Sequence, residues 1–239
     1  MTAPAPAPEP IPSVAADVFG AALPQAERYA LALAGPAIER GLIGPAEASR
    51  VWGRHLLNCA PLAGLIAADA RVVDVGSGAG LPGLVVALLR PDLEVLLVDA
   101  QARRCTFLTE MVDELHLAPR VTVQQARAEE LAGTIRADCV AVRALAPLVR
   151  LIPLCAPLLR PNGEILAIKG ASAAAELAAA EDSVRAYDAR AEIRAVALPD
   201  GSATTTVVRV EVRRPQRRGD RPTTARMSRG ARNSARERR

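Results

Sequence analysis

The spacing of apolar residues divides most of the chain into two parts. Over residues 13–70 apolar positions recur every three to four residues, as on one face of a helix, and prolines stand where first helical turns would lie. Over residues 71–212 the rhythm changes to short, nearly continuous apolar runs that alternate with amphipathic segments. The pattern predicts a helical cap followed by alternating strands and helices.

Seven of the apolar runs have the length and composition of strands. Nearly continuous apolar strands that alternate with helices indicate a mostly parallel sheet, buried on both faces and joined by right-handed crossovers. Turn residues between the last two runs predict a hairpin that adds an antiparallel edge. We therefore expect an α/β fold. The runs are RVVDV at 71–75, EVLLVD at 94–99, VTVQQ at 121–125, DCVAVRA at 138–144, EILAIKG at 164–170, 192–198 and 204–212. Between them we expect, among other helices, a Pro-punctuated one at 148–159 and an Ala-rich one at 172–185.

The two ends of the chain differ from this body in composition. Residues 1–12 are mainly Ala and Pro, which favours extended conformations, so we expect a disordered lead. Residues 213–239 hold eleven arginines and two acidic residues, a charge of +9, which leaves −5 on residues 1–212 of a chain whose net charge is +4. We expect a disordered Arg-rich tail. It either contacts an RNA backbone or is a solvated, dispensable extension.

The overall composition is that of a globular protein, with 50% apolar and 23% charged residues. Neither a long apolar run nor a signal peptide is visible, so we expect a soluble, cytoplasmic monomer without a membrane partner. The four cysteines contain no CxxC pair, which suits neither a zinc site nor a disulfide framework. We expect no metal and interpret as reduced core thiols Cys59, Cys105, Cys139 and Cys155.

The most informative segment is the glycine-rich turn after the first predicted strand, DVGSGAGLPG at 74–83. Its G-x-G-x-G spacing brings the main chain at Gly76 and Gly78 close to a ligand, but it is neither the dinucleotide fingerprint nor a phosphate loop. Asp99 ends the next strand, where a carboxylate can accept both ribose hydroxyls. Asp74 and Asp99 together disfavour a phosphate and suit a cation. S-adenosylmethionine, a nucleoside with a sulfonium and no phosphate, fits these features; the simplest alternative is a plain tight turn.

With these motifs the chain resembles the bacterial RsmG, or glucose-inhibited division B, family of small-subunit ribosomal RNA guanine-N7 methyltransferases. The resemblance runs from about residue 13 to residue 212. It is carried by an ordered set of motifs, which are DVGSGAGLPG, LVDAQARRCTFL, RAEEL, VRALAPL and LAIKG. One departure is visible, because the family's helical Arg-His-x-x-Asp-Ser motif here has Asn58 and Cys59 as its last two residues.

The resemblance implies a class I S-adenosylmethionine-dependent methyltransferase fold, Rossmann-like, with a seven-stranded mostly parallel sheet, helices on both faces and an N-terminal helical cap. It implies methylation of N7 of a guanine in 16S rRNA, with the rRNA or the small ribosomal subunit as partner. Asp99 matches the ribose position of class I methyltransferases generally. The further cofactor contacts that the resemblance implies are Gly76, Leu81, Ala128, Glu129 and Arg143.

Two basic residues are candidate catalytic groups. Arg143 could grip a carboxylate of the cofactor or the O6 and N7 edge of guanine, or else pair with a surface acid. Lys169, the only lysine, ends an apolar strand, where it could meet a phosphate or carboxylate or simply extend into solvent. Arg54, His55 and Asn58 lie at helical spacing and could project toward the same crevice. For His55 a packing role is the favoured interpretation.

Methylation of guanine N7 is compatible with this small set of titrating groups. N7 carries an in-plane lone pair and no proton, so the reaction needs alignment, which alone lowers a barrier by roughly 7 to 11 kcal/mol. The alternatives are a methyltransferase for a small molecule or protein, a noncatalytic RNA-binding assembly factor and, least favoured, a nicotinamide oxidoreductase. The Arg-rich tail is the feature that separates an RNA substrate from a small-molecule or protein substrate.

Overall fold

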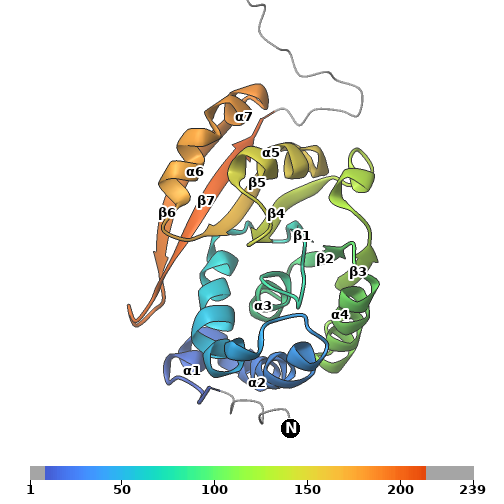
Figure 1. The fold of residues 1–239 in the computed structure, drawn as a ribbon, viewed down its shortest axis with the longest axis vertical. Coiled ribbons are helices and arrows are strands. Elements are labelled where there is room, and N and C mark those ends of the chain that lie inside the picture. The colour runs from blue at the N-terminus through green and yellow to red at the C-terminus, as the bar shows by residue number, and fades with distance from the viewer. Residues whose placement is uncertain (1–8, 214–239) are drawn as a thin grey trace, which may run out of the picture.

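The predicted strands form a single sheet of seven strands in a computed structural model that describes residues 9–213 (Figure 1). The order is β3-β2-β1-β4-β5-β7-β6. The first five of these are parallel, and β7 is antiparallel to both of its neighbours. The predicted sheet and its terminal hairpin are thus confirmed. The strands are β1 Arg71–Val75, β2 Glu94–Asp99, β3 Val121–Gln125, β4 Ala137–Arg143, β5 Leu159–Lys169, β6 Ala189–Ala197 and β7 Thr204–Val212.

Helices cover both faces of the sheet and give it two apolar cores. One core joins the N-terminal helices to α3 and α4, and the other lies under α5, α6 and α7. The helices are α1 Val14–Phe19, α2 Leu23–Ala32, α3 Gly83–Leu89, α4 Ala102–Glu114, α5 Leu148–Cys155, α6 Ala173–Ala179 and α7 Glu181–Ala186. Within residues 9–213 no helix combines the length and apolar character needed to cross a bilayer.

The strand order reverses between β1 and β4, and this reversal determines where on the sheet a ligand can bind. The chain runs outward from β1 through β2 to β3, then returns to β4 on the other side of β1. At such a switch point the two connecting loops diverge and leave a crevice beyond the carboxyl ends of the strands. The glycine-rich turn leaves β1 at this edge, so the sequence places its most informative motif where a ligand can bind.

The N-terminal cap is less regular than its apolar spacing suggests. After α2 it continues as a π-helical segment Leu33–Ala37, a 3₁₀ segment Pro45–Arg50, a second π-helical segment Val51–Leu57 and a second 3₁₀ segment Ala60–Leu65. The expected Ala-rich helix at 172–185 is likewise two helices that meet at Ala180, although neither Gly nor Pro marks the break. All four cysteines are buried and free, which confirms their interpretation as core thiols.

The boundary predicted for the disordered lead, residue 12, lies too far along the chain, because Glu9 already contacts the folded body. Its carboxylate accepts the main-chain N–H groups of Trp52 at 2.8 Å and Gly53 at 3.1 Å. These groups stand in the first turn of Val51–Leu57, where they have no intrahelical acceptor and a negative charge is stabilising. A side chain from the expected lead therefore caps a helix of the folded body. Residues 1–8 and the tail beyond residue 213 lie outside the described residues.

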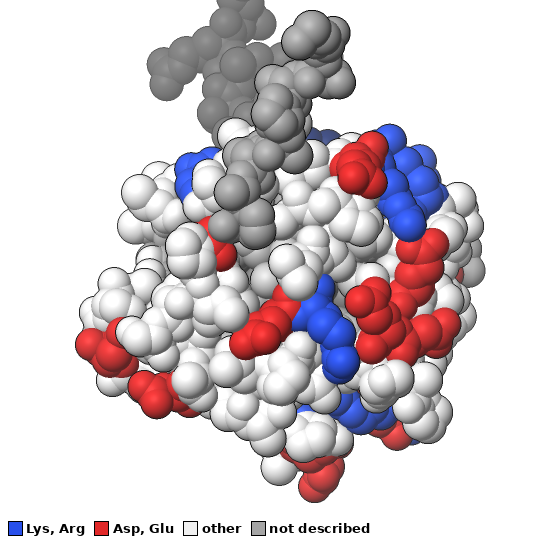
Figure 2. All heavy atoms as spheres, turned by 90° about the horizontal axis from the view of Figure 1, so that it is seen from below, with Lys and Arg blue, Asp and Glu red and all other residues white. Residues whose placement is uncertain are grey.

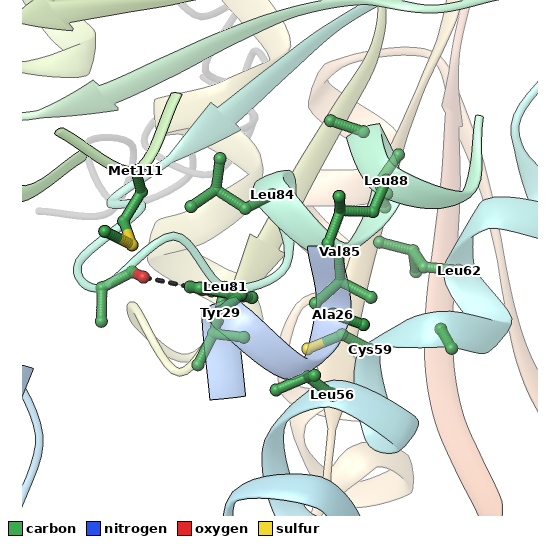
Figure 3. Close-up of a cluster of buried hydrophobic side chains, with 14 of the residues drawn as sticks. Ala26, Tyr29, Leu56, Cys59, Leu62, Leu81, Leu84, Val85, Leu88 and Met111 are labelled. Carbon is green, nitrogen blue, oxygen red and sulfur yellow. Dashed lines mark hydrogen bonds between the residues drawn. The ribbon is translucent and has the colours of Figure 1, made fainter. Parts of the chain in front are cut away.

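The cap is tied to the glycine-rich turn by a buried hydrogen bond. The hydroxyl of Tyr29, on α2, donates to the carbonyl oxygen of Ala79 at 2.7 Å (Figure 3). Tyr29 is fully buried, and Leu81 and Leu84 belong to the same apolar cluster. The turn therefore rests on the cap as well as on the sheet.

Replacing Tyr29 by Phe tests this tie. Tyr29→Phe leaves the buried Ala79 carbonyl without its donor, so we expect the free energy of unfolding to fall by about 1–3 kcal/mol in urea titrations. Tyr187→Phe is the matched control, because its hydroxyl makes no hydrogen bond within residues 9–213, and it should change the value by less than about 0.5 kcal/mol. Equal losses in the two variants would contradict the assigned role of the Tyr29 hydroxyl.

Candidate active site

The glycine-rich turn is a left-handed backbone segment held at the end of two strands. Gly76, Gly78 and Gly80 have φ values of 72°, 59° and 98°, a region that L side chains rarely adopt. The N–H of Gly76 donates to the carbonyl oxygen of Val98 on β2 at 2.8 Å. The Ser77 hydroxyl accepts the N–H of Val98 at 3.1 Å. The turn is therefore fixed beside the carboxyl end of β2, where Asp99 lies.

Close packing explains two of these glycines without any ligand. A Cβ on Gly80 would lie 2.8 Å from the Tyr29 hydroxyl oxygen, and one on Gly76 would lie 2.7 Å from Cδ1 of Leu145. Gly78 differs, because a Cβ there would meet nothing closer than the Gly76 carbonyl oxygen at 3.8 Å. The open space above Gly78 fits the expectation that its main chain faces a ligand, while Gly76 is already covered by Leu145.

Asp74 lies beneath the turn, not in the crevice. Its Oδ2 accepts the N–H of Gly83 at 3.0 Å, and its Oδ1 has no hydrogen-bond partner among residues 9–213. The side chain is fully buried, and desolvation raises the pKa of its carboxyl to about 7, against an ordinary 3.8. The expectation that Asp74 borders the ligand and offers charge to a cation is wrong; its carboxylate braces the start of α3.

The smaller of two cavities at this edge of the sheet has a volume of about 250 Å³. Its wall contains four of the predicted cofactor contacts together with Arg104 and two leucines, Leu145 and Leu154. Ala128 and Glu129 reach it from the first turn of the short helix Ala128–Leu131, which follows β3. The predicted contacts that line this cavity are Gly76, Asp99, Ala128 and Glu129.

Asp99 has less free hydrogen-bonding capacity than the sequence suggests. Its carboxylate accepts the N–H groups of Gly78 at 3.0 Å and Gln101 at 2.9 Å, and it pairs with Arg104 at 3.2 Å. A carboxylate has about four lone-pair sites, so one remains while Arg104 stays in place. Accepting both ribose hydroxyls, as expected from the sequence, would require Arg104 to move. The Nε of Arg104 is buried and has no hydrogen-bond partner within residues 9–213.

The larger cavity, of about 570 Å³, adjoins the first at Leu145. Leu145 lines both cavities and is 39% exposed. The other side chains on its wall include three cations and one carboxylate; those used below are Arg54, Asn58, Arg143, Lys169 and Glu176. The cavity is therefore basic, although residues 1–212 carry a net negative charge.

Arg143 extends from the end of β4 toward the helical cap. Its Nη2 lies 2.7 Å from Nδ1 of His55, and its Nη1 donates to the Cys59 sulfur at 3.2 Å. His55 is 5% exposed, consistent with the packing role favoured for it, whereas Arg54 and Asn58 line the larger cavity. The helical motif that departs from the family pattern thus faces the site. Asn58 uses its amide to donate to the Thr205 hydroxyl at 3.3 Å.

Lys169 already has its partners inside the protein. Its ammonium donates to the Ala146 carbonyl oxygen at 2.6 Å and to Oε2 of Glu176 at 2.7 Å, which holds the pKa of Glu176 below its ordinary value. The same carboxylate oxygen accepts the N–H of Leu148 at 3.1 Å. Lys169 therefore meets a carboxylate, as the sequence suggested, but that carboxylate belongs to α6. The contact fixes the loop that carries Leu145.

Two predicted contacts lie outside both cavity walls. The Leu81 side chain packs in the core beside the cap (Figure 3). Gly78 lies above Asp99, and its N–H is taken by that carboxylate. Any contact from either residue to a ligand would come from main-chain atoms.

The donor set fits S-adenosylmethionine, in two portions. The smaller cavity lies below the roughly 300–1,000 Å³ of typical small-molecule sites, so it suits a nucleoside and not the whole cofactor. It offers the carboxylate of Asp99 and apolar walls, and it lacks a phosphate-binding loop. The amino-acid portion would extend over Gly76 and past Leu145 toward Arg143.

The raised pKa of Asp74 makes stability depend on pH in a defined direction. A carboxyl whose folded pKa exceeds its unfolded value favours folding below pH 3.8, and this contribution is lost as pH rises through about 7. Asp74→Asn keeps an acceptor for the Gly83 N–H and cannot ionise. In urea titrations from about pH 5 to about pH 8, we expect the unfolding free energy of Asp74→Asn to rise relative to that of wild type by about 2.5 kcal/mol.

Asp113→Asn, on the exposed surface of α4, is the matched control and should track wild type at each pH. A difference between Asp74→Asn and wild type that stays constant with pH would show that the Asp74 carboxyl is ionised across the range.

The strand order, the glycine-rich turn and the cavity between Gly76 and Asp99 define a class I S-adenosylmethionine-dependent methyltransferase fold. Solved structures agree. Pyrococcus horikoshii TYW2 in complex with MeSAdo is similar with a TM-score of 0.54 and 14% identity, over 66% of this chain and 62% of that one. The Bacillus subtilis YcgJ protein has a TM-score of 0.52 and 13% identity, over 66% of this chain and 99% of that one.

Within this class the chain belongs to the rRNA small subunit methyltransferase G family, whose model matches residues 22–197. Proteins named ribosomal RNA small subunit methyltransferase G resemble it over most of their length. That of Renibacterium salmoninarum is 47% identical over 85% of this chain and 95% of its own. That of Thermobifida fusca is 49% identical over 84% and 86%. The resemblance noted in the sequence is thereby confirmed.

Proposed function

We propose that this protein transfers the methyl group of S-adenosylmethionine to N7 of a guanine in 16S rRNA of the small ribosomal subunit. Family membership supplies the reaction, and one structural observation supports it most directly. Two cavities, one suited to a nucleoside and one basic, meet at a single side chain, Leu145. A donor whose methyl group extends past Leu145 from the first cavity would meet a base in the second.

The smaller cavity holds the nucleoside portion of the cofactor. Asp99, with Arg104 beside it, holds the ribose, and the turn at Ala128 and Glu129 contacts the adenine. The main chain at Gly76, Gly78 and Leu81 contacts the remainder, which extends toward Arg143. S-adenosylmethionine, when bound, supplies an electrophilic methyl group on a sulfonium.

The target guanine enters the larger cavity. Its N7 and O6 are both acceptors, which suits a wall with three cations and one carboxylate. N7 must keep its lone pair free to attack, so an arginine cannot grip both atoms at once, as the sequence had suggested for Arg143. Arg143 therefore donates to O6 or to a cofactor carboxylate, while Lys169 acts by positioning the loop at Leu145. No residue needs to remove a proton, because N7 carries none.

RNA approaches from the edge that carries the cavities. The side of the helical cap, seen in Figure 2, displays acidic groups in larger clusters than its basic ones, so it offers little attraction to a phosphate backbone. At the cavity mouth, Arg54 has a side chain that is 57% exposed. It is placed to meet a phosphate or base as the nucleotide enters. The monomeric state expected from the sequence is part of this proposal.

The experiment uses small subunits from cells that lack this enzyme. Incubation with methyl-labelled S-adenosylmethionine should label one guanine of 16S rRNA, and chemical cleavage specific for N7-methylguanine should locate the label. We expect Arg54→Ala to lower kcat/KM by about tenfold or more, because it removes a contact at the cavity mouth. Arg160→Ala, which breaks an ion pair with Asp138, is the matched control and should behave as wild type. Absence of label, or label on another atom, would overturn the proposed function.

The Arg-rich tail adds affinity for the RNA backbone that does not depend on sequence. This part of the proposal rests on charge, since residues 213–239 carry +9. Deleting residues 214–239 should weaken subunit binding and flatten its dependence on salt, by about 0.7–0.9 in the log–log slope for each phosphate that the tail no longer neutralises. An unchanged slope in filter-binding titrations would show that the tail does not contact the RNA backbone, and it would not contradict the proposed methyl transfer.

A further inference from the structure

His55 occupies a position that its packing role does not explain. It reaches from the π-helical segment Val51–Leu57 to the end of β4, where its Nδ1 lies 2.7 Å from Nη2 of Arg143. The second terminal nitrogen of the same guanidinium donates to Cys59 at 3.2 Å. Burial raises the pKa of the Cys59 thiol, so the sulfur stays neutral. Both ends of the guanidinium are therefore held from the cap.

The contact determines which ring nitrogen carries the proton. A guanidinium has only N–H donors, so Nδ1 of His55 must be unprotonated to accept one of them. The ring proton then sits on Nε2, which lies 3.0 Å from Oε2 of Glu47, although the two atoms do not have hydrogen-bond geometry. Burial and the positive charge of Arg143 lower the pKa of His55 to about 4, against the opposing effect of Glu47. The imidazole is neutral at physiological pH.

One carboxylate links this pair to the mouth of the larger cavity. Glu47, in the segment Pro45–Arg50, also lies 3.1 Å from Nε of Arg54 and 2.7 Å from Nη2 of Arg50. The charged groups that surround His55 are thus Arg143 from β4 and, from the cap, Glu47 and Arg54. Of these, Arg143 and Arg54 line the larger cavity.

We propose that His55 is a positioning residue for the methyl transfer, because its unprotonated Nδ1 holds the Arg143 guanidinium in place on the wall of the larger cavity. The proposal rests on the proposed function. Arg143 has five N–H groups, and the cap occupies two of them. Three remain for the cofactor carboxylate or guanine O6, with the plane of the group fixed in advance. Because His55 acts through Arg143, its removal should impair turnover only while Arg143 is present.

Two substitutions distinguish the role of His55 Nδ1 as a hydrogen-bond acceptor from the role of the side chain in packing. His55→Leu fills the site and removes the acceptor, whereas His55→Asn places Oδ1 close to the position of Nδ1. With labelled cofactor and small subunits, we expect His55→Leu to lower kcat/KM by about tenfold to 100-fold, as for a misplaced catalytic group, and His55→Asn to recover most of it. His55→Leu combined with Arg143→Ala should lose no more than Arg143→Ala alone. Additive losses, or equal losses in the Leu and Asn variants, would overturn the proposal.

A second measurement is independent of activity. The chain has two histidines, so proton NMR resolves their ring signals and His116→Asn, a control outside the site, assigns them. In wild type we expect His55 not to titrate above about pH 5.5. In Arg143→Ala its titration should move up toward the ordinary value near 6.5. An unchanged titration would overturn the contact. A wild-type protein that transfers no methyl group would instead overturn the proposed function, and the NMR result would still stand.

Discussion

The site depends on one constraint, which is that the turn after β1 needs left-handed backbone conformations at its glycines and must still be fixed by hydrogen bonds to its surroundings. Buried side chains meet this requirement. The carboxylate of Asp74 holds the N–H of Gly83 from below, and the hydroxyl of Tyr29 holds the carbonyl of Ala79 from the cap. The main chain of β2 holds Gly76. Most N–H groups of the turn, from Gly76 to Leu81, are bonded within the protein, so protein contacts alone hold the turn in this shape.

The division of labour between the two cavities follows from their charges. The smaller one has a carboxylate at Asp99 and suits a nucleoside that carries a positive sulfur. The larger one collects cations and suits a phosphate-bearing nucleotide. Leu145 stands where the two cavities adjoin, and the Lys169–Glu176 pair fixes the loop that carries it. An apolar side chain at this junction also limits water where the methyl group would pass, which protects a reactive donor.

The sequence predicted the sheet well because each strand carries its own local signal. Short apolar runs rich in β-branched residues and bounded by turn residues predicted the strands, and the closely spaced glycines after β1 predicted the turn. The contacts that complete the site are different, since 88 residues separate His55 from Arg143 and 50 separate Tyr29 from Ala79. Such pairs appear only when the cap docks on the sheet. The same reason explains why the sequence did not predict the role of Asp74, whose side chain points toward the Gly83 N–H and away from the crevice. It also explains Glu9, which belongs to an Ala/Pro segment and caps a helix that is distant in the sequence.

The direction of β7 places the end of the described chain far from the larger cavity. Thr206 pairs with Lys169 at the cavity edge, and Val212 pairs with Gly163 six residues back along β5. At about 3.3 Å per residue, the described chain leaves the sheet roughly 20 Å from the mouth of that cavity. A fusion joined directly after Arg213 would therefore start clear of the entrance.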